Sequence, residues 1–254
     1  MIIRSDQMEA LEAQTSAVFL AEMEEHLRSF APRLSAAAGE EGVHKAVEMG
    51  LQGARTYGLV KRGPIRFYLE LMCTLGSGFD SDPQLAWATE TLTDQSIPGD
   101  MLRAERLYER LVVYMDQVAG PDQQYAIQAL RNALDFNYEE AARQNEISTP
   151  AILKNLATLY PEKFEFAGAT VMHGIVAQAE QQAAEYGLAD PRAVPVLAGL
   201  QFSFGHQACT DPLYPWISRT LTDPLTVDAE GKLARLISKL RIYADRMLAH
   251  VASV

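Results

Sequence analysis

One stretch occurs twice in this chain, as Ala54-Arg55-Thr56-Tyr57-Gly58-Leu59 and again, 129 residues later, as Ala183-Ala184-Glu185-Tyr186-Gly187-Leu188. The same spacing relates further matches along nearly the whole chain without a gap. The pairs of greatest structural interest are Gly76 with Gly205, Asp82-Pro83 with Asp211-Pro212, and Trp87 with Trp216. Because a register that holds over such a length is hard to obtain by chance, the sequence predicts a tandem duplication.

Apolar residues recur at helical spacing inside both copies. Leu107, Leu111 and Tyr114 form one stripe, and Leu240 and Tyr243 belong to the matching stripe of the second copy. No stretch shows the sustained alternation of a half-buried strand. Helices are expected over residues 6–29, 41–57, 64–75, 83–93, 100–118, 122–144, 149–159, 168–186, 191–203, 212–221 and 228–251. The predicted fold is all-α: one helical-bundle unit present twice, with two pseudo-symmetric halves packed together.

Glycine marks the same expected helix end in both copies. Gly58 and Gly187 each follow a tyrosine at the end of a helical pattern. A left-handed backbone is common just past a helix end, and glycine adopts it most easily. Tyr57 and Tyr186 are expected to act as amphipathic wedges at these ends rather than as proton donors.

Two aspartate-proline pairs mark expected helix starts. In Asp82-Pro83 and Asp211-Pro212 the carboxylate fits an N-cap, and the proline fits the first helical position, where its missing N–H is not needed. Trp87 and Trp216 follow four residues after these prolines. We therefore expect both tryptophans to face the core one turn into their helices.

A turn signal at Gly120-Pro121 is the expected boundary between the copies. It divides the chain into repeat unit 1, residues 1–120, and repeat unit 2, residues 121–254. With 254 residues, 48% of them hydrophobic and 22% charged, the chain can bury a substantial core.

The charge balance argues against nucleic acid as a partner. The net charge is −11, and the basic residues are scattered, whereas phosphate binding requires clustered Lys and Arg. The longest apolar runs, such as 111–115, are far shorter than the roughly 20 residues of a membrane span. No secretory signal precedes the first helical pattern, so a cytoplasmic location is predicted. Cys73 and Cys209 are accordingly expected to be reduced thiols.

Common catalytic motifs are missing from the sequence. Gly76-Ser77-Gly78 follows an apolar helical pattern, so it is expected to form a helix end and a turn rather than a phosphate loop. Glu41 and His44 have the Glu-x-x-His spacing of di-iron bundles. Thr170 replaces the glutamate in the second copy, which excludes a symmetric dinuclear centre. His44 and His173 are therefore expected to be packed or hydrogen-bonded helix residues.

A calcium loop is a further alternative, because Asp80 and Asp82 have the alternate-position spacing of calcium ligands. The later bidentate glutamate is missing, and Cys209 stands in place of the first aspartate in the second copy. Helix capping is therefore the expected role of Asp82. The sequence predicts no catalytic residue, no metal site and no cofactor.

About the first 95 residues carry a pattern of which Phe79-Asp80-Ser81-Asp82-Pro83 followed by Trp87 is the most specific part. The other residues of the pattern are Ile3-Arg4-Ser5-Asp6-Gln7-Met8, Glu25-His26-Leu27, Gly50, Ala54, Tyr57-Gly58, Leu71-Met72, Gly76 and Ala88. With them the chain resembles a small helical protein family of bacterial type VI secretion and polymorphic-toxin gene clusters. The second copy departs from the pattern at Ala208 and Cys209.

This resemblance implies an accessory role beside a secreted effector, as an immunity protein, an adaptor or a chaperone. The hypothesis is therefore a non-catalytic interaction protein that binds an effector or toxin. Two alternatives stay open. One is a metal-dependent helical enzyme that uses the regions of His44 and Asp82, and the other is a structural component of a secretion assembly.

Overall fold

The computed structural model describes residues 5–137, 140, 147–226 and 228–251, and the regular structure among them is helical throughout. The prediction of an all-α fold is therefore confirmed. The α-helices are α1 (Ser5–Phe30), α2 (Pro32–Thr56), α3 (Arg62–Leu75), α4 (Ala86–Thr93), α5 (Asp100–Val118), α6 (Gln124–Asp135), α8 (Thr149–Leu159), α9 (Pro161–Ala167), α10 (Ala169–Glu185), α11 (Ala193–Phe204), α12 (Pro215–Leu221) and α13 (Ala229–Val251). Two short 3₁₀ helices, η1 and η2, span Pro83–Leu85 and Pro121–Gln123.

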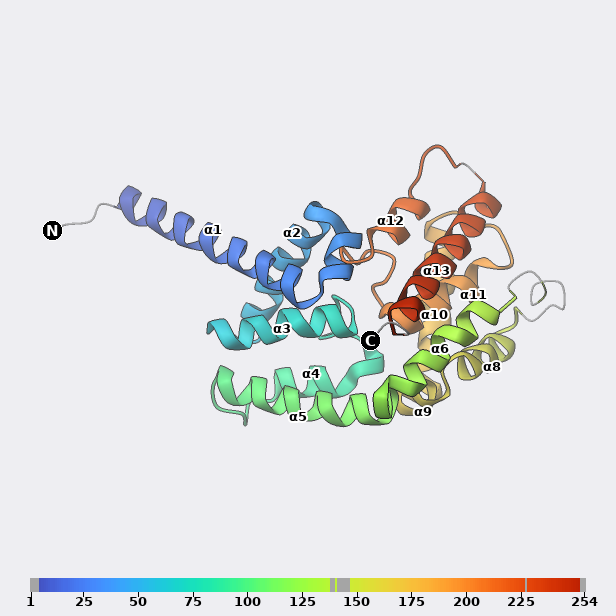
Figure 1. Ribbon diagram of the computed structural model, residues 1–254, viewed down its shortest axis with the longest axis horizontal. Helices are drawn as coiled ribbons and strands as arrows, with labels where there is room; N and C mark the ends of the chain where they lie inside the picture. Colours follow the sequence, from blue (N-terminus) through green and yellow to red (C-terminus); the bar gives the residue numbers. More distant parts are fainter. Residues whose placement is uncertain (1–4, 138–139, 141–146, 227, 252–254) are drawn as a thin grey trace.

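The helices form two groups, with α1 to α5 on one side of the molecule and α6 to α13 on the other (Figure 1). In the first group α1, α2 and α3 pack on one another, and α5 lies against α3 and α4. In the second group α10 packs on α8 and α11, and α13 packs on α6, α11 and α12. Contacts of α9 with α5 and η1, and of α12 with α2, join the groups.

One predicted helix begins earlier than expected, and one short helix, α9, was not predicted; in both places a glycine follows the additional helical turns. Helix α2 starts at Pro32 rather than at residue 41 and contains Gly39 with φ of 74° and ψ of 174°. At the matching position Gly168 has φ of 83° and separates α9 from α10. The helical turns before these glycines were too short to show a periodic pattern of their own.

Two other predictions were wrong in their boundaries. The helix expected over 122–144 is α6, which ends at Asp135 before extended backbone at Phe136; most of the remaining residues lie outside the described part. The helix expected over 212–221 begins only at Pro215, because Asp211 opens a turn instead.

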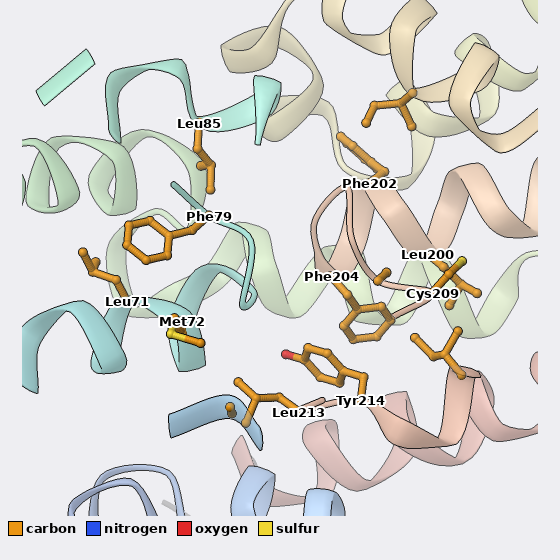
Figure 2. Packing of buried hydrophobic residues seen from close by; sticks show 14 of the residues in the cluster. Leu71, Met72, Phe79, Leu85, Leu200, Phe202, Phe204, Cys209, Leu213 and Tyr214 are labelled. Atoms are coloured by element: carbon orange, nitrogen blue, oxygen red, sulfur yellow. The ribbon is translucent and has the colours of Figure 1, made fainter. Parts of the chain in front are cut away.

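One hydrophobic core runs through both groups of helices, from Met23 to Leu240. In Figure 2 the ring of Phe79 lies between Leu71 and Leu85. The rings of Phe204 and Tyr214 pack together nearby, with centroids 4.7 Å apart. Buried apolar area is the main favourable term in folding, so the shared core ties the two groups into one body.

The helix ends at Gly58 and Gly187 have the same geometry, with φ of 72° and 63°. At the first end, Leu59 N–H donates to the carbonyl of Ala54, and Gly58 N–H donates to that of Arg55. The equivalent bonds close the second end. Both are Schellman motifs, which satisfy carbonyls that a helix end would otherwise leave free.

Candidate functional site

The two groups of helices approach each other closely at a pair of glycines. Gly76 and Gly205 follow α3 and α11, with φ of 101° and 99°. A Cβ atom on Gly76 would lie 2.4 Å from the backbone oxygen of Phe204. A Cβ on Gly205 would lie 3.4 Å from the carbonyl of Leu75. Glycine is therefore required on steric grounds at Gly76, and both positions have a backbone conformation that other residues rarely adopt.

Beside this contact, Asp82 binds the backbone of the other half. The Gln84 N–H donates to Asp82 Oδ1 at 2.8 Å, which is the predicted cap, here of η1. The His206 N–H donates to Asp82 Oδ2, also at 2.8 Å. Asp82 is only 1% exposed, so these hydrogen bonds replace the water molecules that its two carboxylate oxygens would otherwise bind.

Asp211 makes the reverse connection. The Leu213 N–H donates to its Oδ1 at 2.8 Å, and the Ser77 N–H donates to its Oδ2 at 2.8 Å. The Ser77 hydroxyl adds a third bond at 2.6 Å. Ser77 and His206 are themselves matched at the 129-residue spacing. Each aspartate therefore caps its own turn and also holds the turn that follows the glycine in the other half.

The two aspartates differ in their electrostatic surroundings. Burial alone would raise the pKa of Asp82, but the His206 imidazole, backbone N–H groups and the charge of Lys163 outweigh it, so the pKa is lowered. For Asp211 burial outweighs the bonds from Ser77 and Leu213, so the pKa is raised. Only Asp82 is held firmly in the charged form.

The other predicted repeat residues lie around this contact. Trp87 is 8% exposed and packs on Tyr114, whereas Trp216 is only half-buried and packs edge-on against Phe204. Their burial is therefore unequal, although both contact the core. Tyr57 and Tyr186 are half-buried and lie at the C-terminal ends of α2 and α10. The exposed Pro83 is the first residue of η1, and the half-buried Pro212 lies in the turn before α12.

The candidate metal ligands are used in ordinary side-chain pairs. His44 Nδ1 lies 2.8 Å from Glu24, and Glu41 pairs with Lys45 at 2.6 Å. Asp80 accepts a hydrogen bond from the Tyr68 hydroxyl at 2.8 Å, while Asp82 faces the other half. Within the described part of the chain, no group of three or more His, Cys, Asp or Glu side chains is arranged to hold a metal ion.

Both cysteines are free thiols. Burial raises the pKa of Cys73 and of Cys209 to about 12. The thiolate is the reactive form, so neither sulfur is activated as a nucleophile.

The polar groups near Asp82 open into a cavity of about 170 Å³ between the two halves. Its inner wall carries the buried side chains of Asp82, Gln84 and Tyr114. The exposed Thr74 and Ser203, which are matched at the 129-residue spacing, lie at its rim. The lining is completed by Leu75, Leu85, Met115, Val118, Ala119, Ala126, Tyr160 and Lys163.

Lys163, on α9, is the only cation that lines this cavity among the described residues. Its Nζ lies 5.4 Å from the centroid of the Phe202 ring, and no hydrogen-bond acceptor contacts it in the described structure. Lys163 is half-buried, and the partial desolvation of its ammonium lowers its pKa to about 8, against the opposing attraction of Asp82. Perturbed groups of this kind, gathered in a cavity, mark a candidate functional site.

Two further polar atoms of this wall lack partners. Gln84 is 3% exposed, and its Oε1 accepts no hydrogen bond, although its Nε2 donates to Asp82 and to the Gln201 carbonyl. The Tyr114 hydroxyl makes no hydrogen bond with any described residue, and burial keeps its pKa well above the ordinary value. Tyr160, in contrast, donates to the Val118 carbonyl at 2.7 Å.

The equivalent place in the other half has no lysine. At the 129-residue spacing Lys163 corresponds to Leu34, and Phe202 corresponds to Cys73. Both Leu34 and Cys73 pack against the hydrophobic core. Sequence reasoning missed Lys163, although this difference between otherwise matched copies was the available signal.

A second feature is the apolar outer face of α5. Met101, Tyr108 and Val112 are 56%, 57% and 48% exposed, and Leu111 is half-buried beside them. At 100° per residue these four side chains fall within an arc of about 100°. The Tyr108 ring also contacts Phe67 of α3. We call these four residues the α5 face.

The corresponding surface of α13 is different: the counterparts of Met101 and Val112 are the exposed, charged Glu230 and Arg241, and the other two counterparts are buried. Tyr108 and Leu111 correspond to Ile237 and Leu240, each 9% exposed, and α6 packs on α13. Figure 1 shows α6 crossing beside α13, whereas α5 lies along the lower edge of the molecule.

A cleft of about 610 Å³ lies between α4 and α5. Its charged groups pair with one another, as Arg110 does with Glu90 at 3.0 Å and Arg106 with Glu109 at 2.6 Å. Because these pairs are already satisfied and solvent-exposed, the cleft has no feature that selects a ligand.

No helix in the described ranges is both long and apolar enough to cross a bilayer. Comparisons with protein-family models, with curated proteins and with solved structures gave no match to this chain.

Proposed function

We propose that the chain is a non-catalytic interaction protein, built by tandem duplication into two pseudo-symmetric halves, residues 1–120 and 121–254. The reciprocal bonds of Asp82 and Asp211 support the duplication, as do the positive φ angles at matched glycines. The shared core supports a single body in which the halves hold a fixed relation.

The interaction role rests on one observation: another helix packs on the outer side of α13, whereas apolar residues on the matching side of α5 are exposed. Helix α6 packs on α13, where Ile237 and Leu240 are each 9% exposed, whereas Tyr108 of the α5 face, which matches Ile237, is 57% exposed. Exposed apolar groups gathered on one helix are typical of a binding surface. An amphipathic helix from a partner would cover α5 in the way that α6 covers α13.

The charge around the α5 face indicates which helix would fit. Glu105 and Asp116 flank Tyr108 and Val112 on the exposed side of α5, and neither forms an ion pair with a described residue. The chain as a whole carries a net charge of −11. A partner helix with Lys or Arg beside its apolar face would complement this surface and associate faster at low salt.

The family resemblance of the first half supplies the setting. It favours a larger secreted effector or toxin of the same gene cluster as the partner, with this chain as immunity protein, adaptor or chaperone in the cytoplasm. A structural role in a secretion assembly would use the same α5 face but would require no effector. A metal-dependent enzyme has no supporting observation among the described residues.

We expect the double variant Tyr108→Ser, Val112→Ser to bind the cluster's effector at least tenfold more weakly than the unaltered chain. Burying two such side chains contributes more than the 1.4 kcal/mol that a tenfold change represents. Titration calorimetry or biolayer interferometry with the purified effector measures this loss.

Val113→Ser is the matched control, because Val113 is 55% exposed on the same helix but points away from the α5 face. Its affinity should stay within about twofold of the unaltered chain. Equal losses in the control and in the double variant, or no binding of any cluster effector, would contradict the proposal. Co-expression then separates the roles: growth rescue indicates immunity, and improved effector solubility without rescue indicates a chaperone or adaptor.

A further inference from the structure

The cavity beside Asp82 is lined by a lysine, Lys163, and a tyrosine hydroxyl, Tyr114, neither of which has an acceptor among the described residues. The half-buried Lys163 belongs to the second half, and the buried Tyr114 belongs to the first. At the places equivalent to Lys163 and Phe202, the first half has Leu34 and Cys73, which pack against the hydrophobic core.

The size of the cavity limits what it can hold. At about 30 Å³ for each water in the liquid, 170 Å³ corresponds to roughly five to six water molecules. A ligand of about five to seven non-hydrogen atoms fits this space, whereas a nucleotide or a peptide does not.

We propose that this cavity binds a small aldehyde or ketone, which Lys163 captures as an imine. The Tyr114 hydroxyl is available to donate to the carbonyl oxygen. Asp82 stabilises the positive charge of a protonated imine and disfavours a carboxylate ligand in the same space.

The capture step needs no co-reactant. The neutral Lys163 amine attacks the carbonyl carbon with its lone pair, and a C–N bond forms while the π electrons move to oxygen. The oxygen takes up two protons, the nitrogen loses two, and the C–O bond breaks to release water. The released water carries both protons away, and the imine nitrogen takes up one further proton from solvent when it is held in its protonated form beside Asp82.

The surroundings of Lys163 favour this chemistry at neutral pH. With its pKa lowered to about 8 by burial, roughly a quarter of the molecules carry a neutral amine at pH 7.5. An ordinary lysine has about 0.1% in that form. Burial keeps the pKa of Tyr114 above its ordinary value, so this hydroxyl stays a proton donor throughout that range.

Reductive trapping tests the proposal on the intact chain. The protein is incubated with glycolaldehyde and sodium cyanoborohydride at pH 7.5, and the hydroxyethyl group on each lysine is followed by peptide mass spectrometry. Lys163 should be modified at least about tenfold faster than Lys154, an exposed lysine on the neighbouring α8. Its rate should also saturate as the glycolaldehyde concentration rises, because binding precedes capture.

The variant Tyr114→Phe tests whether the cavity itself takes part. It keeps the ring and should slow trapping at Lys163 at least fivefold while leaving the rate at Lys154 unchanged. Equal rates at the two lysines would overturn the proposal. So would a Lys163 rate that rises linearly with concentration, or one that Tyr114→Phe leaves unchanged, since either result describes an open amine with no binding site.

Discussion

Replacing Gly76 by alanine should lower the free energy of unfolding by about 2 to 6 kcal/mol. Two effects add at this position. The backbone has φ of 101°, a conformation that non-glycine residues adopt at a penalty of about 1–3 kcal/mol. The new Cβ would also lie 2.4 Å from the Phe204 carbonyl oxygen, and the halves must separate slightly to accept it, which adds about 1–3 kcal/mol. Equilibrium denaturation by urea measures the loss.

Gly187→Ala separates these two effects. Gly187 has φ of 63°, but nothing lies within 4 Å of a Cβ built there. Its loss should be limited to about 1–2 kcal/mol, the penalty of a left-handed backbone alone. If both variants lose the same amount, the contact between Gly76 and Phe204 is not the close approach described above.

Replacing Lys163 by methionine should stabilise the chain at pH 7, by at most about 3 kcal/mol. The pKa of Lys163 is about 8 in the folded chain and 10.5 as its ordinary value, and each pKa unit is worth about 1.4 kcal/mol. Below pH 8 the ammonium is charged in both states, and the folded chain carries the full penalty of burying it. Between pH 8 and 10.5 only the unfolded chain keeps the proton, so wild-type stability rises with pH.

The advantage of Lys163→Met should therefore shrink from pH 8 upward and disappear above about pH 10.5. Comparison of the two proteins by denaturant titration at several pH values isolates this effect from the titration of other groups. Lys154→Met, at an exposed site, should differ from wild type by less than about 0.5 kcal/mol at every pH. A variant less stable than wild type at pH 7, or a difference independent of pH, would show that Lys163 contributes to the fold rather than to a site.

The longer helices could be predicted well because their buried apolar residues recur at helical spacing over several turns. The stripe of Leu107, Leu111 and Tyr114 spans several turns, and the predicted range 100–118 is the observed α5. The seven residues of α9 complete only about two turns, so no period could distinguish them from a loop. The helical turns before Gly39 and Gly168 were missed for the same reason, because each stretch is too short to show a helical period.

The candidate site was less accessible to sequence reasoning because its members meet only in the folded chain. Asp82 could be recognised as a cap from its neighbour Pro83. Its bond to the His206 N–H could not, because the two residues lie 124 positions apart. The role of Lys163 depends on burial beside Phe202, and nothing in the local sequence reports that burial. The exposed α5 face likewise becomes unusual only when α6 is seen to cover the matching part of α13.

The crossed bonds of Asp82 and Asp211 have a consequence for how the chain opens. The amide hydrogens of Ser77 and His206 are each held by a carboxylate from the other half, at 2.8 Å. Each of these amides can exchange with solvent only when its turn separates from the carboxylate of the other half. Their exchange rates therefore report the free energy of parting the halves. If the two rates converge on that of global unfolding, neither half exists as a folded species without the other.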